Sequence, residues 1–184
     1  NIVYDKNGQN HYDIISAFIK SIRGSDPDAT LFWLANMLEA GEDPNFIFRR
    51  LLISATEDIG LADPNAIVVT QSCCDAFDRV GLPEGLYFLT QASLYLAISP
   101  KSDSNKNIFK ALEKIKSLNF SDVPNHLKHN SFKYKNPHNY PENFIEQEYL
   151  PNELKGTRIW EPNQFGWEKS RYEELLKIKK FKIF

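Results

Sequence analysis

The sequence predicts an all-α fold, in which an antiparallel helical bundle is followed by a proline-rich extended arm and a C-terminal helix. Apolar residues recur at helical spacing through the first two thirds of the chain. Between these segments a glycine, a short gap and then a proline recur, and helices tend to end at glycine and begin at proline. The alternation that marks strands is nearly absent. Because the gaps are short, neighbouring helices should run antiparallel.

Six helices are expected before residue 119, and each is delimited by its glycines and prolines. In chain order they are expected within residues 14–24, 26–41, 41–64, 63–81, 83–100 and 102–118. For the sixth helix, Ser102 or Ser104 is predicted to cap the first free N–H groups. Only the punctuation recurs and the intervening residues do not, so a solenoid of repeats is not predicted.

Residues 41–64 are predicted to form one complete helix at the centre of the bundle. Asp43 can cap its first N–H groups, and Pro44 at the first position loses a donor that has no partner there. Gly60 can take the left-handed conformation that ends a helix. The segment has one main apolar face, while Phe46 and Ile53 lie on a flank almost opposite to it. It should therefore pack on two sides.

A polar seam of Arg50, Ser54, Glu57 and Asp58 runs between these apolar faces. A half-buried charge there needs a partner. One interpretation is an internal ion pair, since Arg50 and Glu57 are two turns apart on the same side, or pairs with neighbouring helices. The other is a charged seam between subunits or with a neighbouring domain. The residues of the candidate interface are Phe46, Arg49, Arg50, Ile53, Glu57 and Asp58.

Composition describes a folded domain with uneven charge. The 184 residues suffice for one domain with a sizeable core and an appended segment. Residues 1–100 hold 6 basic against 13 acidic side chains, a net of −7, and the rest hold 16 against 11, a net of +5. Different ends of the chain should therefore face different partners. A pI near 6.1 argues against a dedicated nucleic-acid binder.

Cysteine usage and hydropathy indicate a cytoplasmic protein. The two cysteines, Cys73 and Cys74, are adjacent, so they form neither a disulfide framework nor a zinc site, and we expect buried, unpaired thiols. No apolar run is long enough to span a bilayer, which predicts no membrane partner. The chain begins at Asn1 without an initiating Met or a basic leader. We expect it to be a fragment of a longer protein.

Prolines and aromatic residues become frequent after residue 118. Residues 119–168 are predicted to be an extended arm, whose apolar groups are too many for a disordered tail. The arm should wrap back over the bundle or over another subunit. Residues 1–118 are thus interpreted as the bundle and oligomerisation core, and residues 119–184 as the arm plus a terminal helix from about residue 169, packed on the same domain.

Catalytic chemistry is not indicated. No Gly-x-x-x-x-Gly-Lys-[Ser/Thr] loop is present, so the chain alone should not bind ATP and is not predicted to be an enzyme. His126 and His129 lack a third ligand nearby, and no metal site is predicted. The one candidate for contact with DNA phosphates is the basic last helix, although its acidic residues weaken the field. Its candidate residues are Lys169, Arg171, Lys177, Lys179 and Lys180.

Several segments resemble one family closely. Ala40-Gly41-Glu42-Asp43-Pro44 and Val123-Pro124-Asn125-His126-Leu127 are examples. The matching segments are residues 5–13, 15–29, 40–44, 57–64, 83–85, 95–102, 123–127 and 147–151. Together they resemble the C-terminal half of the bacterial replication-associated recombination protein A family, AAA+ ATPases similar to the Werner-helicase-interacting ATPase of eukaryotes. Residues 131–138 depart from the family pattern, since they are shorter than its usual loop and contain no glycine.

The resemblance implies that a preceding part of the protein binds ATP and Mg²⁺, and that this region is the helical domain through which the family forms homotetramers, much as clamp-loader subunits join through a helical collar. It also implies a DNA-stimulated ATPase that acts in replication, recombination and repair at stalled forks, associates with DNA and the single-stranded DNA-binding protein, and localises to the cytoplasm at the nucleoid.

The leading hypothesis is therefore an oligomerisation domain, and its rival is a DNA- or protein-binding module that uses the basic C-terminal helix. Self-association of the chain would favour the first. Salt-dependent binding to single strands, lost when the helix is neutralised, would favour the second. A catalytic role for this chain alone has the least support, and intrinsic ATP hydrolysis would be needed to establish it.

Overall fold

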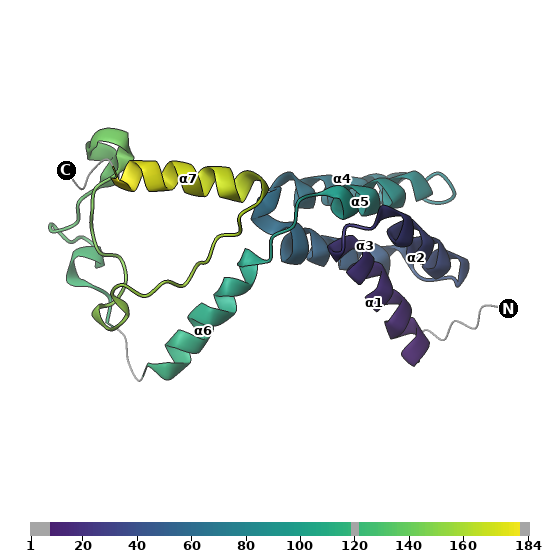
Figure 1. The fold of residues 1–184 in the computed structure, drawn as a ribbon, viewed down its shortest axis with the longest axis horizontal. Coiled ribbons are helices and arrows are strands. Elements are labelled where there is room, and N and C mark those ends of the chain that lie inside the picture. The colour runs from purple at the N-terminus through teal and green to yellow at the C-terminus, as the bar shows by residue number, and fades with distance from the viewer. Residues whose placement is uncertain (1–7, 119–121, 181–184) are drawn as a thin grey trace. The chain divides into compact units, whose positions relative to one another are not determined.

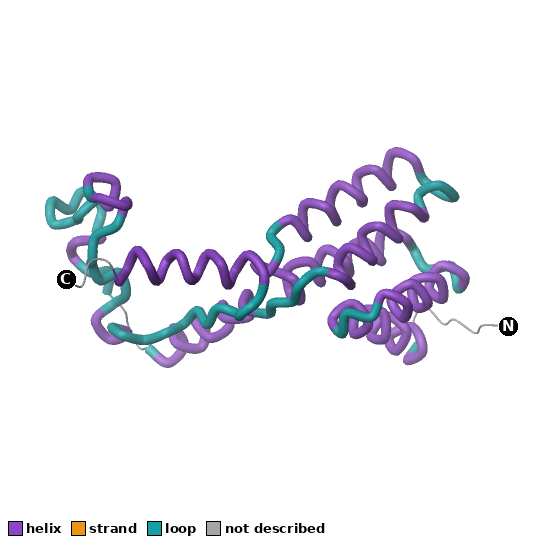
Figure 2. Tube along the Cα trace, turned by 45° about the horizontal axis from the view of Figure 1, so that its top comes forward, coloured by secondary structure: helices purple, strands orange, loops and turns teal. Residues whose placement is uncertain are grey.

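The structure, a computed structural model, describes residues 8–118 and 122–180. Within these ranges it contains seven α-helices joined by loops and short 3₁₀ turns, and no strand (Figure 2). The prediction of an all-α fold with an irregular arm and a C-terminal helix is confirmed. By the contacts within the chain, the described residues up to Asn105 and Asn163–Glu168 form a first compact unit, and Lys106–Pro162 with the residues from Lys169 onward form a second. The division after residue 118 stays a prediction.

The first unit is a bundle of five helices (Figure 1). They are α1 (Gln9–Arg23), α2 (Pro27–Glu39), α3 (Pro44–Ser54), α4 (Asn65–Val80) and α5 (Leu86–Ile98). Their ends follow the predicted punctuation. Asp26 accepts a hydrogen bond from the Ala29 N–H at 2.9 Å, and Asp43 accepts one from the Asn45 N–H at 3.0 Å. Each of these caps precedes a proline in the first turn, where a missing N–H costs nothing.

Helix α5 lies at the centre of the bundle, because it packs against each of α1, α2, α3 and α4. Its residues are apolar around most of the helix, which is typical of an element covered on all sides. Leu89, Ala92 and Leu96 are completely buried. The prediction that residues 41–64 form the central helix was therefore wrong. Helix α3 is one of the neighbours of α5, and its core face carries Phe48 and Leu51.

Residues 41–64 also do not form a single helix. Helix α3 ends at Ser54 and continues as a π-helical turn, Ala55–Ile59, and then a 3₁₀ turn, Gly60–Ala62. Gly60 ends the π-helical turn at φ +49° and ψ −128°, so the glycine stop is at the predicted residue but its backbone is not in the left-handed helical conformation. The wider π-helical turn is the form that α-helices adopt locally at strained or functional positions.

The second unit contains α6 (Asn107–Ser117), four 3₁₀ turns and most of α7 (Gly166–Lys180). The turns are Asn125–Leu127, Pro137–Asn139, Pro141–Asn143 and Asn152–Leu154. Helix α6 has no buried residue, and Lys110 on one side of it pairs with Glu161 at 2.5 Å. Asn107, one turn before Lys110 on the same helix, donates its side-chain amide to the Glu161 carbonyl at 3.4 Å.

The predicted serine cap of the sixth helix was wrong. Ser102 and Ser104 instead donate their hydroxyls to the carboxylate of Glu168, with a distance of 2.6 Å from Ser102 Oγ. Glu168 is only 1% exposed, and these three residues belong to the first unit. Gly166 sits beside them at φ +59°, where a Cβ atom would lie 2.1 Å from the Ala62 carbonyl oxygen. A buried carboxylate needs such donors more than a helix end needs a cap.

Candidate functional site

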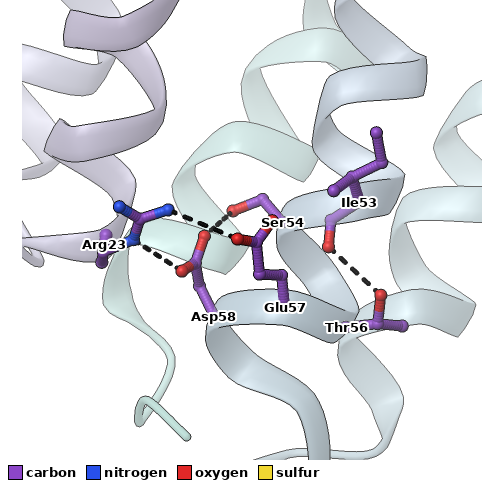
Figure 3. A network of polar contacts seen from close by, with 6 residues as sticks. All are labelled: Arg23, Ile53, Ser54, Thr56, Glu57 and Asp58. Carbon is purple, nitrogen blue, oxygen red and sulfur yellow. Dashed lines mark hydrogen bonds and ion pairs between the residues drawn. The ribbon is translucent and has the colours of Figure 1, made fainter. Parts of the chain in front are cut away.

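The acidic residues of the predicted seam meet α1 at the end of α3 (Figure 3). Asp58, in the π-helical turn, accepts a hydrogen bond from Arg23 Nε at 2.7 Å and another from Ser54 Oγ at 2.9 Å. Glu57 lies farther from the guanidinium, at 3.9 Å from Arg23 Nη2. We call these four residues the polar junction. The structure thus adopts pairing with a neighbouring helix, one of the arrangements that the sequence left open.

Burial makes the polar junction asymmetric. The Asp58 side chain is 4% exposed, whereas the Arg23 side chain is 49% exposed and reaches solvent. The hydrogen bond to Asp58 raises the pKa of Arg23 above its ordinary value, because the bonded carboxylate favours the charged guanidinium. Arg23 therefore supplies the hydrogen-bonded cation of a carboxylate that the fold desolvates.

The π-helical turn is also held by the segment that follows α5. The backbone N–H of Ser102 donates to the Asp58 carbonyl at 2.9 Å, and the Asn105 side-chain amide donates to the Thr56 carbonyl at 2.9 Å. Gly60 lies close to the same segment, since a Cβ there would be 3.0 Å from Asn105 Nδ2. The turn therefore has partners on α1 and on residues 102–105, which accounts for its departure from α-helical geometry.

Four residues of the candidate interface share one face of α3, and we call them the α3 strip: Phe46, Arg49, Arg50 and Ile53. Ile53 is 45% exposed and Arg49 is exposed, with its guanidinium 5.7 Å from the centroid of the Phe46 ring. Arg50 is half-buried, and within the described part of the chain its Nε atom has no hydrogen-bond partner. The structure brings these four together, but places Asp58 inside the bundle rather than on this strip.

A second ionisable pair, which sequence reasoning missed, lies near Phe46. His11 Nδ1 of α1 is 3.0 Å from Glu42 Oε2, and both side chains are buried. The His11 ring also lies 5.6 Å from the Phe46 ring, centroid to centroid. No local pattern points to this pair, because 31 positions separate the two residues.

The α6 apolar face is the larger surface that sequence reasoning missed. Ile108, Leu112 and Ile115 follow helical spacing on one side, with Phe109 on its flank. These four side chains are between 46% and 65% exposed. The sequence shows the helical spacing of these residues, but assigning residues 1–118 to the bundle predicts that they belong to its core. An apolar stripe of this kind that stays exposed is a typical sign of an interaction surface.

The basic residues proposed for DNA contact lie along α7. Lys169, Lys177 and Lys179 are exposed, while Arg171 forms an ion pair with Glu174 of the same helix. The side chain of Lys180 lies outside the described residues. Glu173 and Glu174 interrupt the positive charge, as the sequence indicated. The helix therefore offers separate cations rather than a continuous positive surface.

Other site types find no support in the described residues. Cys73 is buried and Cys74 half-buried, and both are unpaired as predicted. Burial raises the pKa of both thiols. Within residues 8–118 and 122–180 no group of three or more His, Cys, Asp and Glu side chains could hold a metal ion. Across the same ranges, none of the helices has the length and apolar character needed to cross a membrane.

Comparison with known families decides the relationship. Residues 24–179 match the family described as the MgsA AAA+ ATPase C terminal region. The chain belongs to this family. Residues 1–23 match a second family, the AAA C-terminal domain. The resemblance inferred from the motifs is thus confirmed, and α1 lies within the residues that match the AAA C-terminal domain.

Curated relatives agree with this family. The chain is 44% identical to the replication-associated recombination protein A of Bacillus subtilis over 191 residues, covering 96% of this chain and 45% of that protein. The Escherichia coli K12 protein of the same name is 39% identical over 94% of this chain and 41% of its own length. ATPase WRNIP1 of Dictyostelium discoideum is 34% identical over 87% of this chain and 20% of its own length. The chain thus spans less than half of these relatives.

Proposed function

We propose that this chain is the oligomerisation domain of a AAA+ ATPase that acts in DNA replication, recombination and repair at stalled forks, and that it holds four copies together. In this proposal ATP and Mg²⁺ bind to a part of the protein that precedes the chain, and the chain itself carries out no turnover. DNA and the single-stranded DNA-binding protein are partners of the whole protein, in the cytoplasm at the nucleoid. Membership of the AAA+ C-terminal family supports the proposal.

The observation that carries the assembly proposal is the exposed apolar surface. The α6 apolar face leaves four large side chains about half exposed, and Ile53 of the α3 strip is 45% exposed. A second copy of the chain is the occupant that the resemblance implies, and symmetric oligomers reuse the same patch on each copy. The two surfaces belong to different units of the chain.

The magnitudes indicate that one patch is not enough. Fully burying a large apolar side chain stabilises by about 1.5–3 kcal/mol, so half-burying four contributes roughly 3–6 kcal/mol per copy. Association costs about 4–15 kcal/mol in lost motion. One pair of α6 faces would therefore give a marginal dimer, and a stable tetramer needs a second contact, for which the α3 strip is available.

The first experiment is the molar mass of the chain by light scattering over a concentration series. We expect a tetramer, and we expect Leu112→Glu or Ile53→Glu to lower the mass, because a buried unpaired carboxylate costs several kcal/mol. Val80→Glu, at another exposed apolar position, is the matched control. Ile53 is a better test than Phe46, whose half-buried ring contacts His11. A monomer at every concentration would refute the proposal.

The rival proposal, contact with DNA or with the single-stranded DNA-binding protein through α7, is favoured only by the exposure of Lys169, Lys177 and Lys179. The pairing of Arg171 with Glu174 lowers the charge that the helix offers to phosphates. Neutralising the three lysines is expected to abolish DNA binding if this helix carries it, and that variant is included in the experiment below.

A further inference from the structure

We propose that the loop of residues 126–138, here called the basic loop, binds single-stranded nucleic acid. The stretch from residue 123 to residue 141 contains Lys128, Lys133 and Lys135 and three of the four histidines of the chain, with no Asp or Glu. All three lysines are exposed. This run of 19 residues has no acidic side chain within it, unlike α7, although Asp122 and Glu142 flank it, so its three lysines offer phosphates a positive surface.

The basic loop lines an open pocket of about 310 Å³. This volume is at the lower end of the range for ligand sites, which suits one nucleotide unit rather than a large cofactor. The pocket has six lining residues in the described part of the chain, and none of them is acidic. They are His126, Leu127, Lys128, Asn130, Ser131 and Tyr134. An ammonium, an amide and two hydroxyls therefore supply hydrogen-bond donors for phosphate or base oxygens.

Two aromatic rings lie within the same loop. Phe132 is fully exposed, and Tyr134, which also lines the pocket, is 44% exposed. A wholly exposed phenyl ring gains nothing from the fold, whereas it offers a flat surface on which a base can stack. Aromatic rings interleaved with cations are the arrangement through which proteins bind single strands with little sequence preference.

Contacts with Gln147 and Glu148 hold the basic loop in place. Gln147 Oε1 accepts from the Lys135 N–H at 3.0 Å, and Gln147 Nε2 donates to the Lys135 carbonyl at 3.2 Å. At the other end of the loop, His126 Nε2 lies 2.6 Å from the Glu148 carbonyl oxygen. Since a carbonyl can only accept, Nε2 carries the hydrogen of this bond. A loop ordered in advance loses less entropy when it binds.

This supporting segment brings two carboxylates near the loop, Glu146 and Glu148. Glu148 is half-buried, and its Oε1 accepts the Leu150 N–H at 3.1 Å, so part of its charge is satisfied locally. Glu146 is exposed. The lysines of the loop still outnumber these carboxylates, and none of the three forms an ion pair among the described contacts.

An acidic peptide is the competing type of ligand, because it would also be attracted by lysines. The rings decide between the two. Phe132 stands free of any apolar cleft, so it offers a peptide side chain no enclosed site, whereas stacking needs only an open face. The inference depends on the basic loop alone and not on the assembly proposal.

The test is fluorescence anisotropy of the 184-residue chain with a labelled oligothymidylate of about 20 nucleotides, longer than the roughly 4–16 nucleotides that a single-strand site covers. We expect binding that weakens with salt. Replacing the three loop lysines by Gln should flatten the slope of log K against log salt by about 2, at about 0.7 for each phosphate contact. Phe132→Ala should weaken binding about fivefold or more.

Matched variants outside the loop are the controls. Lys169→Gln, Lys177→Gln and Lys179→Gln together remove the same charge from α7, and Phe165→Ala removes another exposed ring. Both should bind as the parent does. Equal losses in these controls, no binding at low salt, or capture of a polyglutamate peptide but not of the oligonucleotide would each overturn the proposal. Light scattering on the same samples reports assembly separately, so the two proposals can fail independently.

Discussion

Replacing Arg23 by Met tests whether the polar junction stabilises the bundle. The substitution keeps most of the aliphatic stem but removes the guanidinium that pairs with Asp58 at 2.7 Å. Asp58 would retain Ser54 Oγ as its remaining side-chain donor, at 2.9 Å, while its side chain stays 4% exposed. Its charge would then lie in a desolvated position without a hydrogen-bonded cation, and Lys101 would remain as the more distant positive charge.

The expected cost is about 2 kcal/mol. A hydrogen bond to a charged group contributes about 1.5–3 kcal/mol, and breaking a fully buried pair costs about 3–5 kcal/mol. The Arg23 side chain is 49% exposed, so solvent already screens the pair and can reach the vacated space. The expected cost therefore lies in the range for a hydrogen bond to a charged group rather than in the range for a fully buried pair. For a chain of this size it corresponds to a melting temperature lower by about 4–8 °C.

The assay is thermal unfolding followed by far-ultraviolet circular dichroism. Lys20→Met is the matched control, because Lys20 is an exposed cation one turn earlier on the same helix, and it should change stability by no more than about 0.5 kcal/mol. Adding Asp58→Asn to Arg23→Met should recover part of the loss, since the unpaired charge is then gone. Equal melting temperatures for Arg23→Met and Lys20→Met would refute the reasoning.

Two further predictions concern backbone strain and pH. Gly166→Ala should destabilise the chain far more than Gly156→Ala in thermal melts. Both glycines have a positive φ, which costs about 1–2 kcal/mol once a side chain is present. Only at Gly166 would the added Cβ atom also overlap a carbonyl oxygen, at 2.1 Å. A hydrogen bond to Asp63 raises the pKa of Tyr95 from 10.0 to about 12. Because the pKa of Tyr95 is higher in the folded chain than in the unfolded chain, its contribution to stability is complete below about pH 10 and is lost as the pH rises to about 12. The Tyr95→Phe variant lacks this titration. A urea midpoint that falls by the same amount in this variant as in the parent would contradict the prediction.

The helix ends could be predicted because their causes are local. Asp26 and Asp43 cap helices whose first turns contain Pro27 and Pro44, and each cap reaches a backbone N–H within three residues. Gly60 was identified as a stop for a similarly local reason. Sequence patterns encode such contacts directly, because both partners lie in the same few residues.

The errors arose where distant residues decide local structure. Ser102 and Ser104 have the side chains of helix caps, yet they bind Glu168, which lies 66 and 64 positions away. Asp58 draws the end of α3 toward Arg23, 35 positions earlier, and the helix widens there into a π-helical turn. Spacing within one segment contains no information about partners that arrive from another, so these choices follow only from the tertiary structure.

For the candidate surfaces, the sequence predicts which residues share a helix face but not whether that face is buried. Helical spacing placed Phe46 and Ile53 on one flank and Arg50 in the polar seam beside it, because spacing determines which residues share a face. It could not determine whether that face meets core or solvent. The same limit caused the α6 stripe of Ile108 and Leu112 to be interpreted as core, although both are exposed. Burial depends on which other elements arrive, and periodicity does not specify them.

The boundary between the two matched families falls at the polar junction. The AAA C-terminal domain match ends at Arg23, and the next family begins at residue 24. Yet Phe18 and Ile22 of α1 are completely buried in the bundle, and Arg23 binds Asp58 across the boundary. A hinge at residues 23–24 would have to expose both apolar side chains, about 1.5–3 kcal/mol each, and leave the Asp58 carboxylate without its cation. Helix α1 must therefore move with the bundle, so the boundary between the two matched families is not a hinge.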